Sequence, residues 1–67
     1  MKIKLNNREE VLEFEFLTIS ELLKVKKYSF EMLIIKINGK LIKNENYSVE
    51  TIKDGDDVMV IHLMSGG

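Results

Sequence analysis

The residues with the clearest chemical potential are the last two, Gly66 and Gly67. The α-carboxylate of Gly67 is an anionic nucleophile at neutral pH, and glycine has no side chain, so both residues allow close backbone approach. Four extended residues, 64–67, reach roughly 13–14 Å, which is enough to thread a narrow channel. At about 7% glycine usage, a terminal pair arises by chance in roughly 0.5% of chains. We therefore expect a reactive tail at residues 65–67, which begins with Ser65; an inert, frayed terminus is the alternative.

No other set of residues suggests an independent reaction. His62 is the only histidine, and no base or nucleophile lies close to it in sequence, which favours a surface position over a catalytic triad. Asp54, Asp56 and Asp57 lack the spacing and the closing glutamate of a calcium loop, so we expect a solvated turn. A second acidic group is expected to be a solvated strand face and not a metal site: Glu9, Glu10, Glu13 and Glu15. We expect no metal.

Composition describes one small globular domain. The 67 residues are 45% hydrophobic and 31% charged, with a net charge of −1 and no basic patch that would suggest nucleic acid. The longest apolar stretch, Val58 to Met64, is too short to span a bilayer. Met1 leads directly into a strand pattern, so we expect no signal peptide and a cytoplasmic location. The chain has no cysteine, which excludes disulfides, thiolate nucleophiles and cysteine metal sites.

Two segments near the N-terminus alternate apolar and polar residues with period two, residues 1–5 and 12–16. The polar link between them predicts a hairpin. If both apolar sets share one face, Ile3 lies opposite Phe14, and the other face pairs lysines with glutamates.

A helix is predicted from residue 19 to residue 26 or 27. Thr18 and Glu21 have the spacing of a capping box, in which each side chain accepts a hydrogen bond from the backbone of the other. One apolar stripe follows at helical spacing: Ile19, Leu22 and Leu23.

The second half of the chain predicts three strands and their turns. In order these are a strand at 33–37, the hairpin turn Asn38-Gly39, a strand at 40–42, a polar turn at 44–50 anchored by Tyr47, a turn at 53–56 and a last strand at 57–64. One helix must cover one face of this sheet. The element order predicts an α+β fold of the β-grasp (ubiquitin-like) type, with a mixed sheet of four to five strands and the last strand beside the first.

The last strand is apolar on both faces. If Val58 and Val60 point inward, the other side chains form an exposed apolar row beside the tail. We expect this row to bind a partner protein, while inverted faces or a covering dimer are the alternatives. The expected binding residues are Met59, Ile61, Leu63 and Met64, extended by Ile34.

Several features together carry a resemblance to a known family. They are the β-grasp order in under seventy residues, N-G-K-L-I at 38–42, K-D-G-D-D-V at 53–58 and the final G-G. In these the chain resembles the ThiS family, the ubiquitin-like sulfur carriers of thiamine biosynthesis. It departs from the family in having no proline after the N-G segment, where residues 43–45 stand instead. The small subunit of molybdopterin synthase is the nearest relative with the same tail, but it tends to be longer and to carry prolines before its glycines.

The resemblance implies a protein cosubstrate, not an enzyme. Residues 1–64 are then the β-grasp domain and residues 65–67 the reactive tail. An E1-like adenylating enzyme of the ThiF type uses ATP to activate the Gly67 carboxylate, and a sulfur donor such as a cysteine desulfurase converts the acyl-adenylate to a thiocarboxylate. A thiazole synthase of the ThiG type receives the sulfur. The resemblance implies no bound cofactor, and we expect a monomer.

The same fold leaves other functions open. The chain could carry sulfur for molybdopterin or another pathway. It could instead be a protein modifier joined to lysines, or an interaction module with an inert tail. An enzyme in its own right is not expected, because the sequence offers no acid–base pair, nucleophile or metal cluster.

Overall fold

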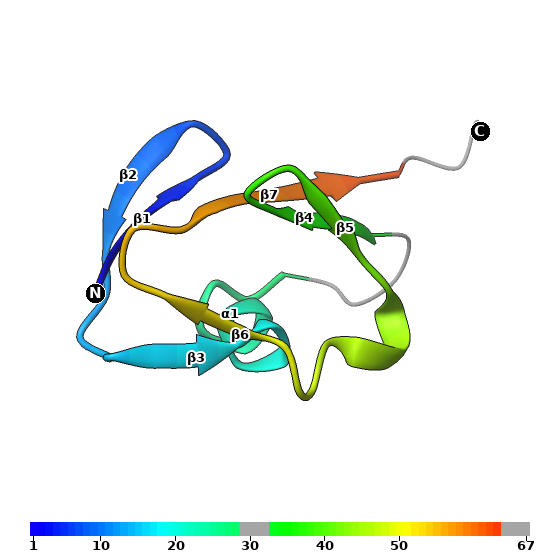
Figure 1. Cartoon of the computed structure of the whole chain (residues 1–67), viewed down its shortest axis with the longest axis horizontal. Coiled ribbons are helices and arrows are strands. Elements are labelled where there is room, and N and C mark those ends of the chain that lie inside the picture. Colours follow the sequence, from blue (N-terminus) through cyan, green and yellow to red (C-terminus); the bar gives the residue numbers. More distant parts are fainter. Residues whose placement is uncertain (29–32, 64–67) are drawn as a thin grey trace.

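The computed structural model describes residues 1–28 and 33–63. A five-stranded sheet has the order β2-β1-β7-β4-β5, and a second sheet pairs β3 with β6 (Figure 1). The strands are β1 Lys2–Leu5, β2 Arg8–Val11, β3 Phe16–Thr18, β4 Leu33–Ile37, β5 Lys40–Ile42, β6 Thr51–Lys53 and β7 Asp57–His62. The described part also contains the helix α1, Ile19–Val25, and a 3₁₀ turn, Asn44–Asn46. This mixed sheet with one α-helix confirms the predicted α+β, β-grasp fold.

The last strand lies in the middle of the main sheet. β7 pairs in parallel with β1, where Lys4 lies opposite Asp57 and Leu5 lies opposite Val58. On its other side β7 pairs antiparallel with β4 along the whole length of that strand. The prediction that the last strand lies beside the first is confirmed. The chain therefore leaves the sheet from its centre and not from an edge.

The N-terminal hairpin forms, but the predicted second strand and register are wrong. β1 pairs with β2, so that Ile3 lies opposite Glu10 and not opposite Phe14. Residues 12–15 form no strand, and Phe14 is 45% exposed. Alternation along residues 12–16 therefore did not mark a half-buried strand of the main sheet.

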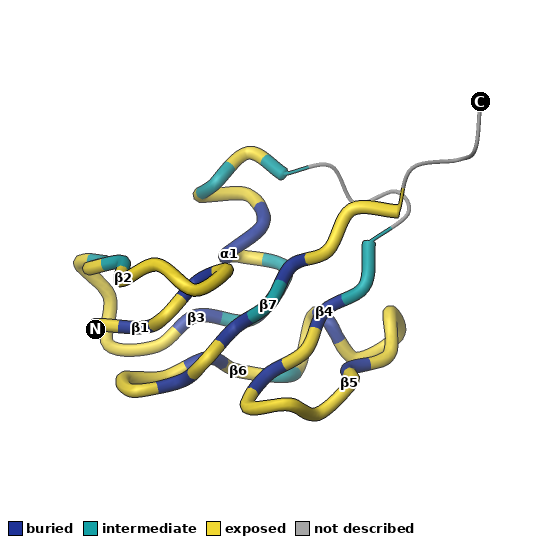
Figure 2. The backbone as a smooth tube through the Cα atoms, turned by 90° about the horizontal axis from the view of Figure 1, so that it is seen from above, coloured by how far each residue is buried: buried dark blue, intermediate teal, exposed yellow. Residues whose placement is uncertain are grey.

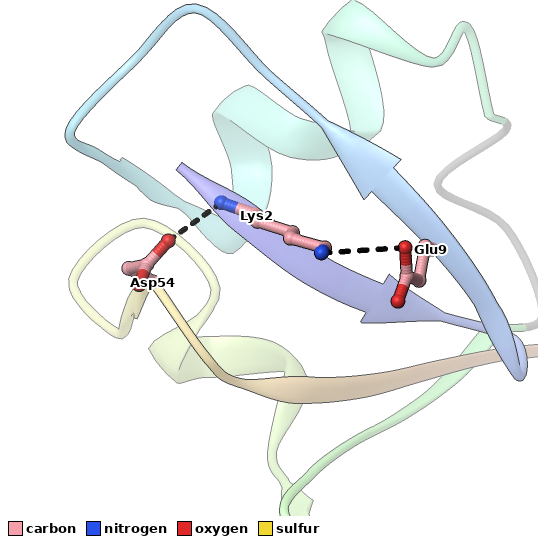
Figure 3. Close-up of polar contacts among 3 residues, drawn as sticks. All are labelled: Lys2, Glu9 and Asp54. Atoms are coloured by element: carbon pink, nitrogen blue, oxygen red, sulfur yellow. Dashed lines mark hydrogen bonds and ion pairs between the residues drawn. The ribbon is translucent and has the colours of Figure 1, made fainter.

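The turn explains the register of this hairpin. Asn6 and Asn7 have φ angles of 51° and 68°, and a two-residue turn with both central φ angles positive matches the twist of a hairpin. The shorter turn brings Lys2 to Glu9, whose side chains lie 3.5 Å apart. Figure 3 shows this ion pair together with the backbone N–H of Lys2, which donates to Asp54 at 2.7 Å. The two contacts tie β1 to β2 and to the turn before β7.

The helix begins as predicted. Thr18 Oγ1 accepts from the backbone N–H of Glu21 at 3.1 Å, and Glu21 Oε1 accepts from the backbone N–H of Thr18 at 2.9 Å. The predicted apolar stripe is fully buried: Ile19, Leu22 and Leu23. α1 ends at Val25, slightly before the predicted end, because Lys27 adopts a left-handed φ of 59°. The Tyr28 N–H then donates to the Leu23 carbonyl at 2.8 Å and closes the end of the helix.

Sequence analysis missed the two-stranded sheet of β3 and β6. Each strand has three residues, and one buried residue in each, Leu17 and Ile52, joins the core. Tyr47 is also buried, as predicted. Figure 2 shows buried positions alternating with more exposed ones along β1 and β7. The core is a single cluster between the sheets and the helix: Ile3, Leu5, Leu17, Ile19, Leu22, Leu23, Ile35, Ile37, Ile42, Tyr47, Ile52, Val58 and Val60.

Candidate functional site

The candidate site is the end of β7, from which the chain continues into the predicted tail. The predicted tail residues lie outside the described part of the chain, as does the predicted binding residue before them: Met64, Ser65, Gly66 and Gly67. The geometry of the site is therefore that of β7, its neighbours and Leu63.

The two faces of β7 differ as predicted. Val58 and Val60 are buried, whereas Ile61 is 38% and Leu63 is 44% exposed. Met59 is half-buried on the same outward face. Ile34 on β4 lies directly opposite Ile61, so it shares that face. We name this surface the outer patch: Ile34, Met59, Ile61 and Leu63. Its role in binding a partner stays a prediction.

Leu41 is a further exposed apolar residue on the face of the outer patch, with Lys36 between it and Met59, and sequence analysis missed it. In the sheet, Lys36 lies opposite both Met59 on β7 and Leu41 on β5. Residues that lie opposite one another point to the same face, so Leu41 faces outward, and it is 59% exposed. The signal was present in the alternation of residues 40–42. It becomes informative only when the order β7-β4-β5 is known.

His62 is exposed, as predicted, and it lies on the inward face of β7 opposite Leu33. Its ring meets the ring of Tyr28 edge-to-face, with centroids 5.5 Å apart and an interplanar angle of 84°. Such aromatic pairs add about 0.5–1.5 kcal/mol beyond the area they bury. The contact holds the end of β7 against the segment that follows α1.

The predicted solvated turn before β7 is wrong for Asp56, which is 6% exposed. One carboxylate oxygen of Asp56 accepts from Asn38 Nδ2 at 3.1 Å, and the other accepts from the Lys53 N–H at 3.0 Å. Asn38 Oδ1 in turn accepts from the Asp57 N–H at 2.9 Å. These bonds join the β4–β5 turn to the start of β7. The carboxylate is buried because two donors satisfy it.

The predicted acidic strand face is also wrong. Glu9 and Glu10 are neighbours on β2 and so point to opposite faces. Glu9 pairs with Lys2, and Glu10 accepts from Lys26 Nζ at 2.7 Å. This hydrogen bond raises the pKa of Lys26 above its ordinary value. The remaining two acidic residues lie outside the strands and are exposed: Glu13 and Glu15.

Within residues 1–28 and 33–63, no group of three or more His, Asp or Glu side chains is arranged to hold a metal ion. In the same ranges, no helix has the length and apolar character needed to cross a membrane.

Comparison with known proteins identifies the family. The ThiS family model matches residues 2–67. The crystal structure of a thiamine biosynthesis protein (ThiS) from Geobacter metallireducens is similar over 100% of both chains, with 30% sequence identity and a TM-score of 0.90. An NMR solution structure of a thiamine biosynthesis protein from the same organism matches 100% of this chain and 88% of the other, with 30% identity and a TM-score of 0.83. This chain belongs to the ThiS family, the small sulfur carrier proteins of thiamine biosynthesis.

Proposed function

We propose that this carrier works as a protein cosubstrate whose reacting group is the Gly67 carboxylate. A carboxylate oxygen attacks the α-phosphate of ATP in an E1-like, ThiF-type enzyme, and pyrophosphate leaves. The terminal sulfur of a persulfide on a donor such as a cysteine desulfurase then displaces AMP, and a thiol cleaves the resulting acyl disulfide, which leaves a thiocarboxylate on Gly67 and a disulfide on the thiol. A ThiG-type synthase takes this sulfur for the thiazole ring. The supporting observation is a family match that extends over residues 2–67 and so includes the glycine pair.

In this proposal the carrier is a substrate and its partner enzymes are the catalysts. The chain supplies a substrate group, and its partners supply the catalysis, so the carrier needs no cysteine of its own. The body presents the tail from the centre of a sheet that is paired on both sides of β7. An exposed apolar surface on that sheet, the outer patch, lies directly beside the exit. Apolar surface at such a place is suited to protein contact.

Intact-mass spectrometry tests this function. The full chain is incubated with ATP, a thiol reductant, and the adenylating enzyme and sulfur donor of the same organism. We expect the mass gain of one oxygen-to-sulfur exchange, located at Gly67, and no gain when ATP is omitted. Attachment of the tail to a lysine would identify a protein modifier instead. An unchanged mass in the complete mixture would contradict the carrier function.

The outer patch has a separate test. We expect Ile61→Ala to raise the KM for the carrier in adenylation about tenfold, because central apolar contacts at an interface are worth about 1–3 kcal/mol. Val49→Ala is the matched control, since Val49 is 68% exposed and lies in the turn before β6. Unchanged adenylation and complex formation by the Ile61 variant would contradict a docking role for the outer patch.

A further inference from the structure

A second surface lies beside the end of β7, apart from the outer patch. It is a cleft between the β1–β2 hairpin and the C-terminal end of α1, which we name the Arg8 cleft. Its lining residues are Leu5, Asn6, Arg8, Glu10, Lys26 and Tyr28. Arg8 lies opposite Leu5, a core residue that is 3% exposed. Arg8 therefore sits on the helix side of the sheet, whereas the outer patch lies on the other side.

The charges of the described residues that line the Arg8 cleft do not balance. Lys26 and Glu10 satisfy each other through a contact of 2.7 Å, and both side chains are about two-thirds buried, at 28% and 31% exposure. Arg8 and Glu10 are two residues apart on β2 and so point to the same side. Among the described residues, no ion pair or side-chain hydrogen bond involves Arg8. Among the described residues that line it, the cleft thus holds one guanidinium in excess of its carboxylates.

The Arg8 cleft is directly attached to the end of β7. Asn6 Oδ1 on one wall accepts from the Val60 N–H at 2.7 Å. The Tyr28 ring on the other wall packs against His62. Both walls therefore contact the last residues of β7. A partner that encloses the tail meets the outer patch on one face of this strand and the Arg8 cleft on the other.

We propose that the Arg8 cleft binds an aspartate or glutamate side chain of the adenylating enzyme that receives the tail. Guanidinium presents a planar set of donors that fits a carboxylate with two parallel hydrogen bonds. A single exposed cation binds a free small anion weakly, because water and salt screen it. A carboxylate that a docked protein holds in place arrives at a high effective concentration. The choice of the adenylating enzyme as the partner rests on the proposed function, whereas the positive charge of the cleft follows from its residues.

Surface plasmon resonance with the adenylating enzyme of the same organism tests the proposal. We expect Arg8→Gln to raise the Kd about fivefold, because it removes the contact with the partner's carboxylate. Arg8→Glu should raise the Kd more than about tenfold, because the reversed charge also repels that carboxylate. Arg8→Lys keeps the charge and is expected to restore part of the affinity. Lys43→Glu is the charge-matched control, since Lys43 is exposed in the link after β5, and we expect a change of less than about twofold.

Several outcomes would overturn the proposal. One is an unchanged Kd for Arg8→Glu in a variant whose melting temperature shows that it is folded. Another is an equal loss for Lys43→Glu, which would mean that only the overall charge matters. A saturable, Arg8-dependent NMR shift on titration with inorganic phosphate, without the enzyme, would assign the cleft to a small anion instead. If the carrier function is wrong, the mass of the chain stays unchanged in the mass measurement. If only the proposed role of the Arg8 cleft is wrong, the mass gain occurs but the Arg8 variants bind with an unchanged Kd.

Discussion

At the scale of single residues, Asp56 shows how a small core accommodates a charge. Three aspartates stand close together in the sequence, and only this one is buried. Its carboxylate accepts from Asn38 and from the backbone of Lys53, so no buried side-chain polar atom is left without a partner in the described part of the chain. Residue types cannot distinguish the three aspartates, because one of the two donors, Asn38, comes from another turn. Burial here depends on contacts between residues eighteen positions apart.

We expect Asp56→Ala to lower the free energy of unfolding by about 1–3 kcal/mol, because it leaves the partly buried Lys53 N–H and the Asn38 amide without their acceptor. Urea-induced unfolding measures the change. Asp57→Ala is the control: its side chain is exposed, and surface changes usually stay within about 0.5 kcal/mol. Equal losses for the two variants would show that the hydrogen bonds of Asp56 carry no particular weight.

At the scale of elements, locally determined structure was predictable and long-range pairing was not. The capping box at Thr18 and the turn at Asn38-Gly39 were predicted correctly, because each acts within a few residues. β2 was missed because residues 8–11 are mostly polar and lie at the edge of the sheet. β3 and β6 were missed because each stabilises the other from a distant part of the chain.

The same distinction holds for the candidate site. The condition that Val58 and Val60 point inward is confirmed, although β7 is apolar on both faces and its sequence left the inverted arrangement open. The position of Leu41 on the same face as the outer patch depends on which strands become neighbours, and so does the Arg8 cleft. Sequence periodicity describes one strand at a time and does not contain that information.

The helix cap gives a prediction with a defined pH dependence. We expect Thr18→Ala to lower the free energy of unfolding by about 1 kcal/mol, as loss of an N-cap does. Hydrogen bonds from the Thr18 backbone and then from its side chain lower the pKa of Glu21 below its ordinary value of 4.5. A lowered carboxyl pKa means that the stabilisation is fully present above that ordinary value and is lost as the pH falls through the lowered one.

Glu21→Gln isolates this effect, because glutamine resembles the protonated side chain. The difference in unfolding free energy between the unchanged chain and the variant should shrink as the solution is acidified from neutral pH. Chemical denaturation across that range measures it. A difference that stays constant with pH would show that the charge of Glu21 has no part in capping.

At the scale of the whole molecule, stability depends on a small core that two sheets and one short helix share. A folded domain has about 0.05–0.15 kcal/mol of stability per residue, which gives about 3–10 kcal/mol for a chain of this length. Ile52 is fully buried and comes from the smaller sheet. This sheet is therefore part of the folding unit and not an appendage.

We expect Ile52→Ala to cost about 2–5 kcal/mol, since the remaining cavity adds to the lost apolar burial. Such a loss is a large share of the total and should lower the melting temperature markedly. Leu41→Ala is the control at a mostly exposed site and should stay within about 0.5 kcal/mol. Circular dichroism during heating measures both variants. A small effect at Ile52 would mean that the β3–β6 sheet contributes little to folding.

The central place of β7 has a consequence for biosynthesis. Neither β1 nor β4 gains the neighbour on its inner side until residues 57–62 have been translated. A nascent chain on the ribosome therefore cannot complete the sheet until β7 has left the exit tunnel. Products of interrupted translation that stop before residue 57 keep two strands with unpaired backbone groups, which are sites for misassociation. We expect quality-control proteases to degrade such fragments before they reach the biosynthetic enzymes.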